Sequence, residues 1–249
     1  MAKAQRKTVW RPETDKVRRV IDKLSKQHPG AWTELAFNNA YELLIATVLS
    51  AQSSDVRVNG VTPALFERYP DARSLARATT GELEPQIKST GFFRAKSRSL
   101  AALSAALVAE HGGNVPRTME ELTALPGVGR KTANVVLGHA FDVPGLPVDL
   151  HVLRVANRIG IAKSEEPVEV ESQLTGALPG KKWVLASDVL ILHGRRICRP
   201  RPLCDQCSVR GDCDYYKALG PKAAPKVAKP AATPPRRATA TPARRAGGK

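Results

Sequence analysis

Residues 125–131 read Leu-Pro-Gly-Val-Gly-Arg-Lys and join two predicted helices. Pro126 ends the first helix, because the residue before a proline disfavours the helical region. Gly127 and Gly129 permit positive φ and leave their backbone N–H groups bare, while Val128 fits the core between the helices. The second helix begins with its amides and the positive end of its dipole pointing out of the turn. The turn predicts a phosphate-binding site that reads no base sequence, with an ordinary glycine-capped helix turn as the alternative.

The rest of the chain predicts an all-α fold with short connections. Residues 15–28 place apolar side chains at helical spacing, and residues 41–51 are apolar nearly all round, which predicts a buried helix. Thr62 and Pro63 predict a helix start, with threonine as N-cap and proline at the first helical position. No alternating strand run and no repeat of fixed period is present. Further helices are expected over residues 94–110, 129–140, 149–160, 168–178 and 182–196.

Charge points to a polyanionic partner. The 249 residues carry a formal charge of +16 and have a pI near 10.1, which suits DNA, RNA or an anionic membrane surface. The hydrophobic fraction of 42% excludes wholesale disorder, and no apolar stretch of about 20 residues or secretory signal is present. Residues 217–249 hold nine Lys and Arg and no acid, which predicts a disordered basic tail. Residues 1–11 predict a second flexible basic arm. Two roles stay open for the tail, either keeping the protein in solution or contacting nucleic acid.

All four cysteines lie within one short segment, in the pattern Cys198-x5-Cys204-x2-Cys207-x5-Cys213. The clustering excludes scattered disulfides and indicates a local metal site in a reducing compartment. Zinc ribbons usually use two well-separated C-x2-C pairs, whereas four closely spaced thiolates suit a [4Fe–4S] cluster. Residue chemistry alone leaves both zinc and an iron–sulfur cluster open.

Several segments resemble the endonuclease III family of helix–hairpin–helix DNA glycosylases, in the expected order over about residues 12–216. The resemblance implies two helical domains that flank a DNA-binding cleft. A six-helix barrel-like domain would cover residues 33–145, with the hairpin at about 117–140, and an iron–sulfur cluster domain would combine 12–32 with 146–216. The segments that resemble the family are LLIATVLSAQSSD (43–55), STGFFRAKS (89–97), LPGVGRKTANVVL (125–137), PVDLHVLRVANRIG (147–160) and LILHGRRIC (190–198) with the cysteines that follow.

Lys131 and Asp149 are the expected catalytic pair. Lys131 lies in the first turn of its helix, where the helix dipole, Arg130 and partial burial would each lower the cost of a neutral amine. A Schiff-base nucleophile needs a neutral amine, although the residues alone also allow a phosphate-binding lysine. Asp149 is well placed as an N-cap. The resemblance implies that Lys131 is the nucleophile and that Asp149 supports charge developing at the sugar.

The resemblance also implies residues that contact DNA. Gln52 matches the plug residue that fills the space left by an extruded base, and Phe92 occupies the wedge position, with plain packing as its alternative. His151 is expected to border the pocket, and Asp55 is a pocket or helix-capping candidate. The expected DNA contacts are Gln52, Phe92, Gly127, Val128, Gly129, Arg130, His151, Arg199 and Arg201, with Arg195 and Arg196 beside phosphate as well.

The resemblance assigns the cysteines to a [4Fe–4S] cluster with a structural or DNA-affinity role. The first spacing here is five residues, whereas the family usually has six, so the loop before Cys204 is one residue shorter. The implied metal ligands are Cys198, Cys204, Cys207 and Cys213.

The function implied is excision of oxidised pyrimidines from double-stranded DNA, followed by β-elimination that nicks the abasic strand. We expect a monomer in the bacterial cytoplasm, associated with the nucleoid and not with a membrane. One alternative is an adenine glycosylase of the same superfamily, which would lack the nucleophilic lysine and usually adds a C-terminal domain. The other is a non-enzymatic DNA-binding protein that uses the hairpin for backbone contacts.

Overall fold

The computed structural model describes residues 10–220, and this part of the chain contains helices and no strand. The predicted all-α class is therefore confirmed. Most of the predicted arm (residues 1–11) and of the predicted tail (217–249) lies outside the described residues. The helices are α1 (Thr14–Gln27), α2 (Ala40–Leu49), α3 (Asp55–Arg68), α4 (Ala72–Ala76), α5 (Thr80–Ile87), α6 (Phe93–His111), α7 (Met119–Ala124), α8 (Arg130–Phe141), α9 (Leu150–Ile159), α10 (Pro167–Ala177), α11 (Trp183–Arg196) and α12 (Asp214–Leu219), with short 3-10 turns at Lys88–Thr90, Gly180–Lys182 and Cys204–Gln206.

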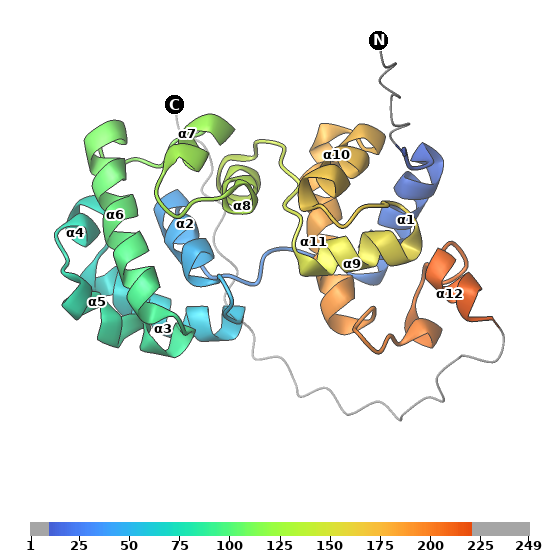
Figure 1. The fold of residues 1–249 in the computed structure, drawn as a ribbon, viewed down its shortest axis with the longest axis horizontal. Coiled ribbons are helices and arrows are strands. Elements are labelled where there is room, and N and C mark those ends of the chain that lie inside the picture. Colours follow the sequence, from blue (N-terminus) through green and yellow to red (C-terminus); the bar gives the residue numbers. More distant parts are fainter. Residues whose placement is uncertain (1–9, 221–249) are drawn as a thin grey trace, which may run out of the picture.

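The helices form two lobes, each with its own apolar core (Figure 1). Helices α2 to α8 make the central lobe. Helix α1 comes first in the chain, but it packs in the terminal lobe with α9, α10, α11 and α12. Its apolar face is fully buried there, through Val17, Val20, Ile21 and Leu24. Each such side chain contributes roughly 1.5–3 kcal/mol of burial. The boundaries of the predicted domains stay a prediction.

Helix α2 shows how composition decides position in the fold. Every residue from Tyr41 to Leu49 is buried, as its all-round apolar sequence predicted. Asn39 caps the helix by accepting a hydrogen bond from the Glu42 N–H. The helix ends at Leu49, shortly before exposed Gln52. The buried helix therefore positions an exposed turn at the boundary between the lobes.

Two local predictions were wrong. No helix begins at Thr62-Pro63, because α3 already starts after Ser54 and continues through Pro63. Val58, Thr62 and Leu65 lie on one buried face of α3, and burying that face outweighs the hydrogen bond that proline removes. The predicted tail also begins too early, since α12 extends to Leu219.

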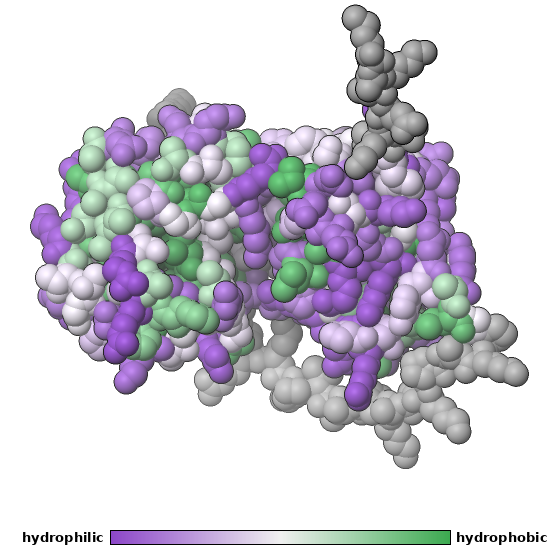
Figure 2. Space-filling model, viewed as in Figure 1, coloured by the Kyte–Doolittle hydropathy of each residue, from purple (hydrophilic) through white to green (hydrophobic). Residues whose placement is uncertain are grey.

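The surface is mixed in character. Hydrophilic residues predominate over the terminal lobe on the face drawn in Figure 2, with hydrophobic residues scattered over both lobes. Exposed ion pairs, such as Lys16 with Asp214 and Lys23 with Asp212, tie α1 to the C-terminal segment and are worth about 0–1 kcal/mol each. Within residues 10–220, none of the helices has the length and apolar character that crossing a bilayer requires.

Candidate functional site

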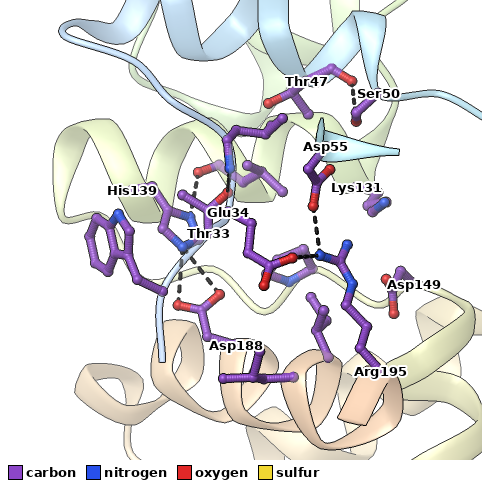
Figure 3. A pocket seen from close by; sticks show the side chains of 16 residues that line it. Thr33, Glu34, Thr47, Ser50, Asp55, Lys131, His139, Asp149, Asp188 and Arg195 are labelled. Atoms are coloured by element: carbon purple, nitrogen blue, oxygen red, sulfur yellow. Dashed lines mark hydrogen bonds and ion pairs between the residues drawn. The ribbon is translucent and has the colours of Figure 1, made fainter. Parts of the chain in front are cut away.

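A cavity of about 70 Å³ lies where the two lobes meet, and both members of the expected catalytic pair line it (Figure 3). Lys131 comes from α8 of the central lobe, and Asp149 precedes α9 of the terminal lobe. Asp55 and Arg195 line the same cavity. The fold therefore brings an amine and a carboxylate from opposite lobes to one polar space.

The turn before α8 has the positive φ suggested at Gly127 but not at Gly129, which adopts an extended backbone with φ of −92°. Gly127 adopts φ of 76°, and Val128 is only 6% exposed and belongs to the central core. Gly129 is the N-cap of α8 and supplies no side-chain cap. A Cβ at Gly129 would meet no atom within 4 Å, so space lies open above the first amides of α8. This arrangement suits an anion at the helix N-terminus.

Lys131 is exposed at the cavity, so the partial burial expected for it is absent. Its neighbour Arg130 donates two hydrogen bonds of 2.8 Å to the Glu171 carboxylate on α10, and this contact raises the pKa of the Arg130 guanidinium. The positive charge beside Lys131 is thus balanced by a carboxylate from the opposite lobe. Sequence reasoning missed Glu171 because it lies 41 residues away.

Asp149 caps α9, as predicted. Its Oδ1 accepts hydrogen bonds from the backbone N–H groups of His151 and Val152, at 2.7 and 2.8 Å. These two bonds fix the carboxylate at the edge of the cavity. Capping α9 is compatible with a role of Asp149 at the reacting sugar, because the two backbone hydrogen bonds orient its carboxylate.

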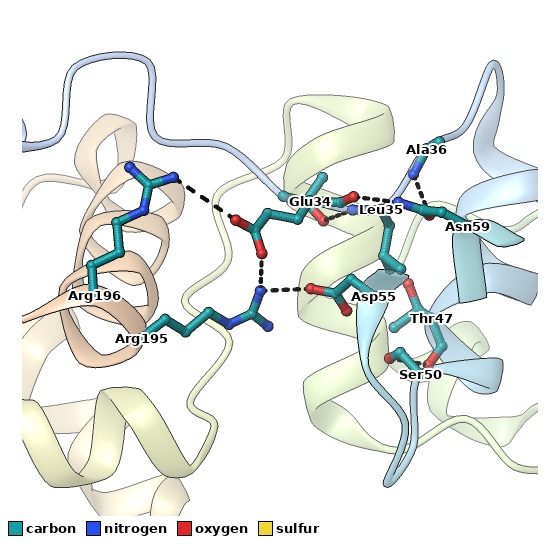
Figure 4. Close-up of polar contacts among 10 residues, drawn as sticks. Glu34, Leu35, Ala36, Thr47, Ser50, Asp55, Asn59, Arg195 and Arg196 are labelled. Atoms are coloured by element: carbon teal, nitrogen blue, oxygen red, sulfur yellow. Dashed lines mark hydrogen bonds and ion pairs between the residues drawn. The ribbon is translucent and has the colours of Figure 1, made fainter. Parts of the chain in front are cut away.

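Arg195 bridges the two lobes (Figure 4). From α11 it donates to Glu34 in the segment between α1 and α2, and to Asp55 at the start of α3 at 2.6 Å. The Arg195 guanidinium is therefore paired with two carboxylates, and its expected contact with phosphate stays a prediction. Arg196 is exposed, and its guanidinium lies 4.0 Å from Glu34.

We expect Arg195→Met to lower the free energy of unfolding by about 1–3 kcal/mol, because it leaves the largely buried Asp55 carboxylate without its partner. Urea unfolding of both proteins measures this. Arg196→Met is the matched control and should change stability by less than about 0.5 kcal/mol, because that side chain is exposed. Equal losses in the two variants would show that the Arg195 bridge contributes nothing specific.

The two expected DNA-probing residues share an unusual backbone. Gln52 and Phe92 adopt φ of 52° and 49°, and within residues 10–220 Asp142 is the one other non-glycine residue with positive φ. Phe92 is 66% exposed, so its ring does not pack in the core. Buried Lys96 donates a 2.8 Å hydrogen bond to the Thr90 carbonyl and thereby supports the Phe92 turn. Such strained, exposed positions cluster at functional sites.

The other expected DNA contacts lie elsewhere. His151 does not line the cavity and packs instead against Gly194, where a Cβ would come within 2.9 Å of it. Burial lowers the pKa of His151. Arg199 and Arg201 are exposed on the loop after Cys198, and Arg158 holds that loop by donating to the Arg199 carbonyl at 2.7 Å.

All four cysteines line a second cavity, in the terminal lobe. Burial raises the pKa of the Cys207 thiol to about 11, and burial together with the neighbouring sulfurs raises the pKa values of Cys204 and Cys213. Among residues 10–220, no three His, Cys, Asp or Glu side chains are arranged to hold one metal ion. The four thiols thus share one apolar space.

Two histidines connect α1 to this cavity. His193 Nε2 lies 3.5 Å from Cys207 Sγ, and His193 Nδ1 lies 3.0 Å from His28 Nε2. Burial lowers the pKa of His193 to about 4, so the ring is neutral near pH 7. If Cys207 is a thiolate, it accepts from Nε2, and Nδ1 in turn accepts from His28. Both histidines are almost fully buried, so these contacts fix the His193 ring beside the Cys207 sulfur.

Comparison with known proteins gives a consistent result. A family model described as HhH-GPD superfamily base excision DNA repair protein matches residues 45–179. Endonuclease III of Synechocystis sp. is 47% identical over 197 residues, which cover 78% of this chain and 90% of that protein. Endonuclease III of Escherichia coli is 38% identical over 201 residues, covering 80% and 95%.

Solved structures agree. A trapped endonuclease III–DNA covalent intermediate matches with a TM-score of 0.80 and 40% identity, over 83% of this chain and 98% of that one. A non-covalent endonuclease III–DNA complex gives a TM-score of 0.79. A thermostable thymine-DNA glycosylase, 22% identical with a TM-score of 0.74, shares the fold.

Proposed function

The chain belongs to the endonuclease III family of base excision DNA repair proteins, and from this premise we propose that it excises oxidised pyrimidines and nicks the abasic strand. It is a bifunctional DNA glycosylase and abasic-site lyase. The observation that supports the assignment of residues is that Lys131 and Asp149 line one cavity between the lobes. Borohydride trapping on abasic duplex DNA tests it.

In the proposed reaction the damaged nucleotide turns out of the duplex into the cavity. The Lys131 amine attacks C1′ of the sugar while the bond to the base breaks and its electrons leave with the base. Asp149, held by its two amide bonds, stabilises the cationic sugar. The nitrogen then loses a proton, the C1′–O4′ bond breaks, and O4′ takes up a proton, which opens the sugar and leaves an iminium at C1′. The iminium acidifies a C2′ proton, and loss of that proton expels the 3′ phosphate by β-elimination.

The alternatives fit less well. An adenine glycosylase of this superfamily would lack the lysine, whereas Lys131 lines the cavity here. A protein that only grips the DNA backbone would need the hairpin but no amine–carboxylate cavity. Both alternatives predict that no covalent adduct forms on reduction.

The cysteine cavity supports a [4Fe–4S] cluster held by Cys198, Cys204, Cys207 and Cys213. Four thiols around one apolar space, in one compact stretch of sequence, suit a [4Fe–4S] cluster, and the similarity to endonuclease III supports this choice over zinc. Burial raises the pKa of the Cys207 thiol, so a bound cationic metal group would be needed to hold these sulfurs as thiolates. We assign the cluster a structural role and leave it outside the chemical step.

The surroundings of the hairpin support contact with the DNA backbone through Gly127, Gly129 and the first amides of α8. Gln52 and Phe92 would fill the space left by the extruded base, while Arg199 and Arg201 are free to meet phosphate from the cysteine loop. The proposed partner is damaged double-stranded DNA in the bacterial nucleoid, bound by a monomer.

We expect Phe92→Gly to keep or raise the free energy of unfolding, by up to about 1 kcal/mol, because glycine relieves the left-handed backbone. Base excision should nevertheless fall by about tenfold or more, since the wedge is gone. Chemical unfolding and single-turnover excision measure the two effects. Asp142→Gly is the control, because it relieves the same backbone at the C-terminal end of α8 and should leave excision intact. Unchanged excision by Phe92→Gly would remove Phe92 from the DNA contacts.

A further inference from the structure

His28 and His193 are two buried histidines that the proposed reaction does not use. His28 ends α1 as its C-cap and is 5% exposed, and His193 on α11 is 1% exposed. Their rings meet edge to face, with the centroids 5.3 Å apart and the planes at 65°. A buried polar group without a hydrogen-bond partner costs about 1–3 kcal/mol, so the partners of these rings decide where their protons lie.

The contacts of the two rings form a row that ends on a cysteine sulfur. His28 Nε2 lies 3.0 Å from His193 Nδ1, and His193 Nε2 lies 3.5 Å from Cys207 Sγ. Both rings are buried, and in the part of the chain that the structure describes no carboxylate is hydrogen-bonded to either of them, so both are neutral. A neutral imidazole has one N–H, and His193 therefore donates to only one of its two neighbours.

The state of Cys207 decides which neighbour receives that proton. A metal-bound thiolate has lost its proton and acts only as an acceptor, so the proton of His193 must lie on Nε2 for this contact to be a hydrogen bond. Nδ1 then presents a lone pair, and the N–H of His28 Nε2 donates to it. With a free thiol the S–H donates to Nε2 instead, and the row of bonds runs in the opposite direction. Metal binding thus selects one tautomer of each ring.

The end of α1 also holds the backbone on both sides of Cys207. Gln27 Oε1 accepts from the Ser208 N–H at 3.1 Å, and Gln27 Nε2 donates to the Gln206 carbonyl. Gln206 and Ser208 are the chain neighbours of Cys207, and His28 follows Gln27 directly. Two consecutive residues of α1 therefore fix the position of the Cys207 backbone and of the ring that faces its sulfur.

We propose that His193 donates a hydrogen bond to the Cys207 sulfur of the bound [4Fe–4S] cluster, and that His28 fixes the proton of His193 on the nitrogen that faces this sulfur. This inference rests on the cluster assigned under the proposed function. Hydrogen bonds to ligand sulfurs stabilise the reduced cluster, because it carries one more negative charge than the oxidised cluster. The two histidines are thus positioning residues that raise the reduction potential of the cluster and stay outside base excision.

The first test measures the one-electron reduction potential of the cluster by voltammetry of the full-length wild type, His193→Phe and His193→Gln. Phenylalanine fills the place of the ring but has no N–H, so the equilibrium constant for reduction should fall by about 3- to 10-fold, which is a potential about 28–59 mV lower. The glutamine amide nitrogen is as many bonds from Cα as Nε2 is, so His193→Gln keeps the donor. Its equilibrium constant should stay within about 1.5-fold of the wild-type value.

The second test makes the same pair of changes at His28. His28→Phe removes the donor to Nδ1 and should lower the equilibrium constant for reduction by less than His193→Phe does, whereas His28→Gln keeps an N–H in that place and should match the wild type. Adding His28→Phe to His193→Phe should lower the potential no further, because His28 acts through His193. Each variant that holds iron should form the borohydride-trapped adduct as the wild type does.

The outcomes separate the two histidines from each other and from the cluster. A wild-type potential in His193→Phe, or equal losses in His193→Phe and His193→Gln, would overturn the donor role of His193. A further fall in the double variant would overturn the role of His28. If His193→Phe holds no iron, the His28 pair decides, and equal potentials in His28→Phe and the wild type overturn the inference. Wild-type protein without an iron–sulfur signal would instead overturn the cluster assignment.

Discussion

Lys131→Gln should form no covalent adduct with abasic duplex DNA on borohydride reduction, whereas the wild-type protein should form it readily. Only an amine can condense with the sugar aldehyde to give an imine that borohydride reduces to a stable bond. Glutamine keeps a polar side chain that is one bond shorter, and it lacks that amine. Base excision should fall by about 10³-fold or more, as it does when enzymes lose their nucleophile. Gel separation of the cross-linked complex and single-turnover excision measure both losses.

The fold of this variant should be intact, because Lys131 is exposed at the cavity. Its melting temperature should therefore stay within about 2 °C of the wild type. Arg130→Gln is the matched control, since it changes the adjacent cation, breaks the contact with Glu171 and leaves the amine in place. That control should still form the adduct. An undiminished adduct in Lys131→Gln would show that a different amine attacks the sugar.

The parts of the site that the sequence predicted are those decided by local geometry. The Gly127 turn, the burial of Val128 and the Asp149 cap each depend on residues within a few positions of one another, so their patterns are readable in the chain. The catalytic assignment came from the family resemblance, because composition and spacing could not separate a nucleophilic lysine from a phosphate-binding one.

The parts that escaped prediction depend on contacts between distant segments. Arg195 meets Asp55 from 140 residues away, and His139 meets Asp188 from 49 residues away. Neither pair has a local pattern, because the partners come together only when α11 of the terminal lobe packs near the central lobe.

Cys204→Ala should lose the metal group and destabilise the terminal lobe. The segment from Cys198 to Cys213 consists of turns and one short 3-10 helix, and Val209 is its only fully buried non-cysteine side chain. So little apolar burial cannot hold sixteen residues in place, and a bound cluster would supply the missing free energy. We expect the brown colour and the bound iron to be lost and the melting temperature to fall by about 10 °C or more, corresponding to several kcal/mol.

Visible absorption, elemental iron and thermal unfolding measure this loss, and Ser208→Ala is the matched control in the same loop. Its hydroxyl is exposed and bonds only to Gln27, so iron and melting temperature should be unchanged. Iron retained at the wild-type level in Cys204→Ala would remove that thiol from the ligand set. Wild-type protein that is colourless and carries zinc would reverse the choice of metal. The four thiols that share one cavity are therefore the structural feature on which a metal site depends, and the similarity to endonuclease III is what favours an iron–sulfur cluster over zinc.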